Sequence, residues 1–391
     1  MFGTTSPSAL RAARSQTWAS ISSSVGAQRR LLSASSALRA SEIISFQSTG
    51  SRQLNEDLNT FREKFILPTY LTQEEQKKMH SPKWKDKLQR DPFRLEIDGV
   101  VHKFYYVDKI TGYPNTKELF TRILNRMKKP SYIANNLMPL LQGLKRAQRK
   151  LDPTMWPKIV RKAALAGSLD TVIRCIQHAD KTGFRLSTSE TISELLCYIQ
   201  QPAIENDFKR TKVESALKKI QTVLDLLEGE RDIHKPTPDS EGRYPFYRDP
   251  QFLAARLHMA AALAVHHKEG KDKNGRVTKY AEELVRLWPE GAGLLDLQPD
   301  LSYKNKEKMA YLLDRNEYLW VASPILNGLN LAAQVVDPGL AMQLQNRADA
   351  VESEVRVALA AEDRKKGGRG EIIYNKLFNP RASQEEAAEE D

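Results

Sequence analysis

The residues with the clearest chemical potential lie between Arg122 and Lys162, where basic side chains gather. This stretch contains eleven lysines and arginines and a single acid, Asp152, so its net charge is +10. The eleven are Arg122, Arg126, Lys128, Lys129, Lys145, Arg146, Arg149, Lys150, Lys158, Arg161 and Lys162. Cations at this density neutralise phosphates and release their counterions, which is the electrostatic basis of nucleic-acid binding. The stretch therefore predicts contact with a polyanion such as RNA.

The spacing of these cations predicts that several share a helical face. Arg122, Arg126 and Lys129 follow one another at steps of four and three residues, which puts side chains on one side of a helix. A second group, at 146–150, repeats this arrangement further along the chain. Contacts of this kind hold a phosphate backbone without reading its bases. The alternative is a basic face that only water covers.

Motifs for catalysis are missing from the sequence. It contains no GxxxxGK[ST] loop for nucleotides, no HExxH, no GxSxG, and no GxGxxG after a predicted strand. We therefore predict that the protein is not an enzyme and that it uses no cofactor and no small-molecule substrate.

Histidine and cysteine do not form a metal-binding pattern either. His258 and His266 share a predicted helix but are eight residues apart, which is too far for ligands on adjacent turns. Cys175 and Cys197 are the only cysteines, so neither a disulfide framework nor a zinc site is expected. Both lie on apolar helical faces, where a thiol behaves as a small hydrophobic group.

Helices must position the basic side chains, because from Asn115 onward the chain reads as helices joined by short loops. Glycines at 167 and 183 are typical helix stops, and Ser168, Ser187 or Thr188, and Asp337 followed by Pro338 are typical starts. The expected helices cover 116–129, 131–150, 154–166, 168–182, 188–200, 208–229, 249–267, 275–288, 304–320, 323–336 and 338–365. The segment 320–336 contains Pro324 and several polar residues, so we expect a buried helix pair there and no membrane span.

One β-hairpin is expected before these helices. Phe93, Leu95 and Ile97 alternate with polar residues, Asp98-Gly99 supplies a tight turn, and the chain returns over 101–107. A short helix is expected over 54–65, followed by a helix that opens with a capping box. A lone hairpin is only marginally stable, so it must pack against helices or a partner.

The N-terminus has the composition of a targeting segment. Residues 1–40 contain no Asp, Glu or Lys, and five arginines are spread among serines and alanines. Such an Arg-rich, Ser-rich and acid-poor segment is typical of a mitochondrial transit peptide, and no continuous apolar run suggests a secretory signal. We predict cleavage near 32–40 and a location in the mitochondrial matrix; a disordered Ser-rich tail is the alternative.

The segment Thr154–Ser187 resembles one unit of the pentatricopeptide repeat family, whose units are two antiparallel helices of about 35 residues in all. The resemblance rests on Ala163, Ala166, Gly167, Leu169, Val172, Ile176, Gly183 and Phe184. Segment 188–229 resembles a degenerate second unit, and 251–290 is similar to a tetratricopeptide-type pair. No regular period recurs, so a base-by-base RNA code is not expected. An ordinary helical hairpin is the alternative.

Together these features predict a mainly α fold: an irregular helical-hairpin solenoid with one N-terminal β-hairpin and disordered termini. The predicted divisions are a transit peptide (1–48), an extension with the hairpin (49–115), a basic repeat domain (116–233), a linker (234–250), a C-terminal helical domain (251–365) and a tail (366–391). The chain has 391 residues, a net charge of +11 and 40% hydrophobic residues, which suits a basic protein with a real core.

Three functions fit these expectations. The preferred one is a non-catalytic scaffold of a mitochondrial ribonucleoprotein, because the presequence and irregular solenoid are similar to lineage-specific mitochondrial ribosomal proteins of filamentous fungi. That resemblance implies rRNA and neighbouring ribosomal proteins as partners. The second is an RNA maturation or translation factor of the pentatricopeptide type, which should have more regular repeats. The third is a respiratory-complex assembly factor, which leaves the basic stretch without a role.

Overall fold

The structure is a computed structural model that describes residues 43–97, 99–236, 242–305 and 308–379. It is mainly helical, with a single two-stranded antiparallel sheet among the residues described. The predicted mainly α fold with one N-terminal β-hairpin is therefore confirmed. Most of the predicted transit peptide and the acidic end of the predicted tail lie outside the described residues, so both stay predictions.

The hairpin lies in an N-terminal segment that contributes to two apolar cores: residues 52–66 pack into the main core of the chain, and residues 67–104 form a small core of their own. Its elements are α2 (Arg52–Phe61), a π-helical turn η1 (Arg62–Ile66), η2 (Leu67–Tyr70), α3 (Gln73–Met79), η3 (Pro82–Trp84), α4 (Lys85–Arg90), β1 (Phe93–Ile97) and β2 (Val100–Phe104). The strands pair from Phe93 with Phe104 to Ile97 with Val100. A small apolar core is formed by Leu67, Leu71, Met79, Leu95, Ile97 and Phe104. The hairpin thus packs against helices, as its marginal stability requires.

Two local predictions in this unit are confirmed. Thr72 caps α3, and Glu75 bonds back to the backbone of Thr72, which completes the capping box. Gly99 closes the hairpin with φ +75°, a conformation that a residue without Cβ adopts without strain. Asp98, the other predicted turn residue, lies outside the described residues.

The basic stretch falls on the next helices. They are α5 (Thr116–Arg126), α6 (Pro130–Arg146), α7 (Met155–Leu165), α8 (Leu169–Gln177) and α9 (Ala179–Thr182). The helix expected over 168–182 is divided at His178 into α8 and α9. Gly167 follows α7 and Gly183 follows α9, both in the left-handed conformation, so both predicted helix stops are confirmed. Ser168 precedes α8 without capping it, because its hydroxyl bonds to that of Thr171.

The C-terminal part is a thicker helical bundle. Its elements are α10 (Ser189–Glu205), α11 (Arg210–Gly229), η5 (Phe246–Arg248), α12 (Pro250–His267), α13 (Arg276–Leu287), α14 (Asp300–Lys304), η6 (Ala310–Leu313), α15 (Arg315–Ala333), α16 (Pro338–Ala360) and α17 (Arg369–Phe378). Thr188 caps α10 and Asp337 caps α16, as predicted. Helix α17 occupies residues that the sequence analysis placed in a tail.

The helix pair expected over 304–336 is wrong, because α15 runs without a break from Arg315 to Ala333. Pro324 has no backbone N–H, which leaves the carbonyl of Trp320 without its usual helical donor. The thiol of Cys197 on α10 lies 3.5 Å from that oxygen and donates to it. Residues 300–313 form α14 and η6 instead of a long helix.

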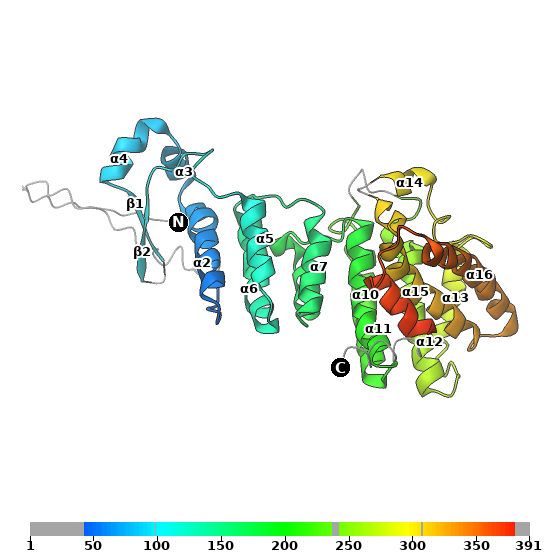
Figure 1. Cartoon of the computed structure of the whole chain (residues 1–391). Helices are drawn as coiled ribbons and strands as arrows, with labels where there is room; N and C mark the ends of the chain where they lie inside the picture. Colours follow the sequence, from blue (N-terminus) through cyan, green and yellow to red (C-terminus); the bar gives the residue numbers. More distant parts are fainter. Residues whose placement is uncertain (1–42, 98, 237–241, 306–307, 380–391) are drawn as a thin grey trace, which may run out of the picture.

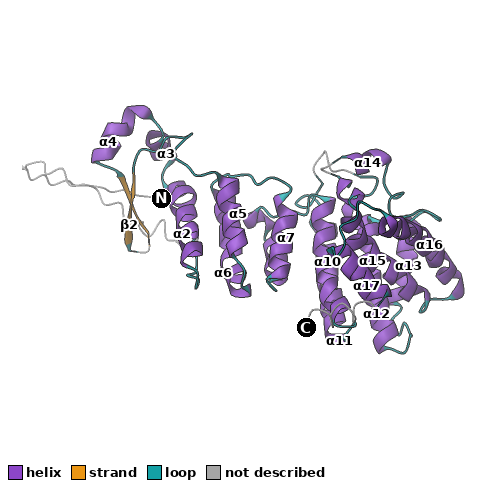
Figure 2. Ribbon diagram, in the orientation of Figure 1, coloured by secondary structure: helices purple, strands orange, loops and turns teal. Residues whose placement is uncertain are grey.

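Successive helical hairpins stack along the chain. The hairpins α7–α8, α10–α11, α12–α13 and α15–α16 are each formed by neighbouring helices in contact, and their first helices touch in the order α7, α10, α12, α15. Figure 1 shows α2, α5, α6 and α7 in a row beside the bundle, and Figure 2 shows the sheet confined to the N-terminal end. One apolar core continues from Leu54 to Ile373. Helices on both sides of the predicted linker share that core, and the predicted domain divisions stay predictions.

Candidate nucleic-acid interface

The eleven predicted cations lie on α5, α6 and α7 and on the two joints between them. Helix α5 ends at Arg126 and α6 begins at Pro130, so Lys129 lies in a joint and does not continue the face of Arg122 and Arg126. In the same way α6 ends at Arg146, and 149–150 follow it beyond a left-handed Gln148. The expected sharing of helical faces is therefore correct only for Arg122 and Arg126.

Arg122 and Arg126 hold a buried carboxylate of another helix. The guanidinium of Arg122 lies 3.0 Å from Oδ1 of Asp57 on α2, and Arg126 pairs with Oδ2 of the same group. Asp57 is 7% exposed, and Arg126 also donates to the carbonyl of Gln53. A carboxylate this buried needs charged partners. These two arginines therefore attach α2 to α5.

Three more of the predicted cations contact neighbouring elements. Arg146 donates to the hydroxyl of Thr69 at 2.9 Å and stacks on the ring of Tyr70. Lys145 donates to main-chain carbonyls at 179–180. Arg161 lies 2.9 Å from Glu194, whose carboxylate is buried on α10. These side chains hold their neighbours in place, whatever else they touch.

The lone acid of the stretch is also held locally. Asp152 accepts hydrogen bonds from the backbone and hydroxyl of Thr154 and pairs with Lys117 at 3.3 Å. The hydroxyl and backbone of Thr154, followed by Lys117, lower the pKa of this carboxyl. Asp152 is therefore ionised at neutral pH. It pairs with Lys117, which lies outside the basic stretch, and not with one of the eleven cations.

Five exposed lysines remain: Lys128, Lys129, Lys150, Lys158 and Lys162. None of these five forms an ion pair with an acid among residues 43–97, 99–236, 242–305 and 308–379. We call them the exposed lysine set. Lys158 and Lys162 lie one turn apart on α7, and the turn at Gly167 lies against Pro130, close to Lys129. Within the set, the ammonium of Lys129 lies 5.7 Å from the centroid of the Tyr132 ring. Arg149 is exposed as well, but its guanidinium lies over two rings, those of Phe65 and Tyr113.

A concave surface beside this set includes one cation that the sequence analysis missed. Lys145, Arg146 and Lys181 line a pocket of about 660 Å³ together with the backbone segment 43–47. Lys181 lies on α9, outside the basic stretch, and Gly183 brings α9 against the side chain of Lys145. Only the packing of α9 on α6 places these cations together. The left-handed Gly183 was the one signal in the sequence that pointed to this turn.

Other kinds of site find little support in the described residues. In that part of the chain, no three His, Cys, Asp or Glu side chains are placed to hold a metal ion. His258 is buried between the amide groups of Gln200 and Asn327, and burial lowers its pKa to about 4. Burial raises the pKa of Cys175 to about 12 and that of Cys197 further, so both remain thiols.

None of the helices in the described ranges has the length and apolar character that a membrane span requires. Even α12, the most apolar of the long helices by sequence, contains Arg256 and three histidines.

Comparison with known proteins gives one consistent result. The family described as mitochondrial ribosomal protein mS27 matches residues 30–376, which is most of this chain. The small ribosomal subunit protein mS27 of Neurospora crassa is 39% identical to it over 349 residues. That alignment covers 85% of this chain and 87% of the Neurospora protein.

Proposed function

This chain belongs to the mitochondrial ribosomal protein mS27 family, which makes it a structural component of the mitochondrial ribosome, and from that premise we propose that it holds rRNA of the small subunit on the exposed lysine set. Its contacts are to phosphates and do not read the base sequence. It works in the mitochondrial matrix without catalysing a reaction, next to other ribosomal proteins.

The division among the basic residues supports this proposal. Five of the eleven cations are bound to other parts of the same chain, through Asp57, Thr69, Glu194 and the carbonyls of α9. The exposed lysine set has no such acidic partner in the described ranges. Unpaired lysines at the surface have a hydration shell and counterions that a phosphate can replace. The binding cations are therefore a subset of those predicted.

We also propose that the hairpins α7–α8, α10–α11, α12–α13 and α15–α16 are irregular repeats of the pentatricopeptide or tetratricopeptide type. Their first helices pack on one another in chain order, which is the arrangement of a solenoid. The loops that separate them differ in length, so the exposed faces cannot present one base-reading side chain per repeat. The hairpins act as a scaffold that fixes the lysines on α7 and its joints.

Sedimentation tests the location of the protein. Mitochondrial lysate is run on a sucrose gradient at moderate magnesium, with and without RNase. We expect the chain to migrate with the small ribosomal subunit and to leave that position after RNase treatment. A free, low-mass peak in the untreated sample would contradict the proposal.

Charge removal tests the lysines. In full-length protein, the five members of the exposed lysine set are changed to Gln, and binding to a ribosomal RNA fragment is measured at several salt concentrations. The slope of log affinity against log salt should fall by roughly 0.7 to 0.9 for each lysine that touches a phosphate. The matched control changes five exposed lysines elsewhere: Lys209, Lys212, Lys218, Lys273 and Lys279. An equal loss in the control would overturn the assignment.

A further inference from the structure

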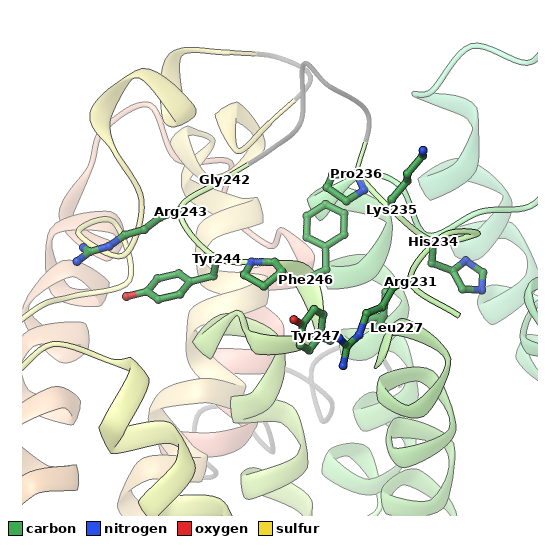
Figure 3. A pocket seen from close by; sticks show the side chains of 11 residues that line it. Leu227, Arg231, His234, Lys235, Pro236, Gly242, Arg243, Tyr244, Phe246 and Tyr247 are labelled. Carbon is green, nitrogen blue, oxygen red and sulfur yellow. The ribbon is translucent and has the colours of Figure 1, made fainter. Parts of the chain in front are cut away.

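A second surface, away from the exposed lysine set, combines aromatic and basic side chains. It is a pocket of about 320 Å³ between the end of α11 and the segment that leads into α12. Figure 3 shows Leu227 and Arg231 on one side and Tyr244, Phe246 and Tyr247 on the other. Its volume is at the lower end of the range of about 300 to 1,000 Å³ that is typical of small-ligand sites.

The aromatic side chains of this pocket are held by the core. Phe246 is buried and packs edge-on against Phe252 of α12. The hydroxyl of Tyr244 donates to the carbonyl of Leu287 at 2.9 Å, which fixes the orientation of its ring. Rings that are fixed before binding lose little conformational entropy when a flat ligand stacks on them. The rings of Phe246 and Tyr244 are therefore held in place before a ligand binds, beside the half-buried ring of Tyr247.

Guanidinium groups accompany two of these rings. That of Arg231 lies 4.1 Å from the centroid of Tyr247, and that of Arg243 lies 5.5 Å from the centroid of Tyr244. Arg231 also contacts Glu228, but its side chain is 55% exposed and can still face a ligand. Aromatic rings interleaved with arginine suit nucleobases, which stack on both, and the charges attract the attached phosphates.

The chain connects this pocket with the basic helices. Gly183 lies against Lys145, and three residues later the backbone N–H of Leu186 donates to Nδ1 of His234, which also lines the pocket. Arg185 lies between Gly183 and Leu186 in the sequence and is exposed. Its positive charge is close enough to His234 to contribute, after burial, to the lowered pKa of that imidazole. A polyanion bound along α6 and α9 thus has a basic route to the pocket.

We propose that this pocket binds an unpaired nucleobase of single-stranded RNA, stacked against Tyr247 and Arg231. The inference rests on the proposed RNA contact and adds to it a site for a base. A duplex cannot enter, because its bases are already stacked and paired. An extended peptide of a neighbouring protein is less well matched, since Arg231, Lys235 and Arg243 all surround the pocket and favour an anionic chain.

Crosslinking and affinity measurements on the full-length protein test the proposal. The probes are a short single-stranded RNA that contains 4-thiouridine and a duplex of equal length. We expect a nucleotide adduct on Tyr244 or Tyr247. Tyr247→Ala should lower affinity for the single strand by about tenfold, a typical loss for one stacked base, and leave duplex affinity unchanged. Tyr105→Ala removes an exposed tyrosine outside the pocket and serves as the matched control.

The outcomes separate this proposal from the previous one. If the glutamine changes in the exposed lysine set weaken both probes while Tyr247→Ala weakens neither, the pocket proposal is overturned and the lysine assignment stands. If neither the lysine variant nor Tyr247→Ala weakens RNA binding, both proposals are overturned. Thermal unfolding of each variant checks that the fold is intact; should Tyr247→Ala unfold, Arg231→Gln is used, with the same selective loss expected. A pocket found filled by a peptide of a neighbouring protein in purified small subunits would also overturn the proposal.

Discussion

The helices α5–α9 and the bundle α10–α17 differ in how exposed their polar side chains are. In the first region, cations lie at the surface, where they attach neighbouring helices or face water. In the bundle, α10, α12 and α15 are buried on nearly all sides, so their polar groups must find partners inside. The polar side chains of the first region are therefore largely at the surface, whereas many of those in the bundle are enclosed and bonded to one another.

The bundle contains several buried polar groups that depend on one another. Arg369 of α17 pairs with Glu194 on α10 and with Glu317 on α15, and its guanidinium lies over Trp320. Burial, followed by like charges nearby, raises the pKa of Glu190 beside this group. Such networks are costly when one member is lost. In the first region, by contrast, loss of a single lysine leaves no buried charge behind.

The largest effect is expected from Arg369→Met. It leaves the buried carboxylate of Glu194 and the half-buried carboxylate of Glu317 without their shared partner, and the free energy of unfolding should fall by about 3 kcal/mol. Arg161 still pairs with Glu194, which keeps the loss at the lower end for a buried pair. Urea unfolding measures it. Adding Glu194→Gln to this variant should recover part of the lost stability. If Arg369→Met alone lowers the free energy of unfolding by less than about 1 kcal/mol, the bundle tolerates unpaired charge and does not differ from the first region in this respect.

A slightly smaller loss of stability is expected at acidic pH, because unfolding allows His258 to take up a proton. Its pKa is lowered by burial to about 4, against about 6.5 when unfolded, so below pH 6.5 the unfolded chain binds more protons. The stability that neutral His258 contributes is present above pH 6.5 and is lost as pH falls toward 4, by about 2 to 3 kcal/mol. Unfolding curves of wild type and His258→Gln from pH 7.5 to 4.5 test this. Parallel pH profiles for the two proteins would count against it.

Asp57→Asn on α2 tests the two arginines of the first region that pair with this carboxylate. It removes the charge that pairs with Arg122 and Arg126, and because both arginines are partly exposed we expect a loss of only about 1 to 2 kcal/mol. Because two cations are released, the affinity for RNA should stay the same or rise. Fluorescence anisotropy at about 100 to 200 mM salt, close to physiological ionic strength, measures this affinity. Weaker RNA binding would mean that the two arginines bind RNA in the paired arrangement.

The smallest effect is expected in the hairpin unit. Thr72→Ala removes the capping box of α3 and should cost about 1 kcal/mol. Since the hairpin has its own small core, hydrogen exchange should quicken at 73–79 and not in the bundle. Thr72→Ser retains the hydroxyl and is the control. Faster exchange throughout the bundle would show that the two cores unfold together.

Local signals in the sequence were sufficient for much of the fold. The capping box at Thr72, the hairpin turn at Gly99 and the helix stops at Gly167 and Gly183 depend on neighbouring residues, and the structure has them all. Helix α17 was missed because a Gly-rich basic stretch precedes it and its stability comes from packing on α15. The continuous α15 was missed because Pro324 is a helix breaker unless a distant donor, here Cys197, contacts the freed carbonyl.

The candidate site was predictable only in outline. The density of cations at 122–162 could be counted, but their partners could not. Asp57 lies 65 residues before Arg122, and Glu194 lies 33 residues after Arg161. Lys181 joins the basic surface because α9 folds back on α6. Pairing over such separations is a property of tertiary packing, so the sequence alone could not show which of the cations pair within the chain.

The position of Arg369 near the C-terminal end of the described chain means that it is synthesised after both of its acidic partners. A chain is synthesised from its N-terminus, and hairpins that contact their neighbours in sequence can fold as they emerge. Glu194 on α10 and Glu317 on α15 are then in place before α17 exists. Until α17 is synthesised, Glu194 has Arg161 as its partner, and both acids lack the guanidinium of Arg369 that they share in the folded chain. A chain that stops at 368 would lack this guanidinium, and Glu317 would lose the arginine with which it pairs.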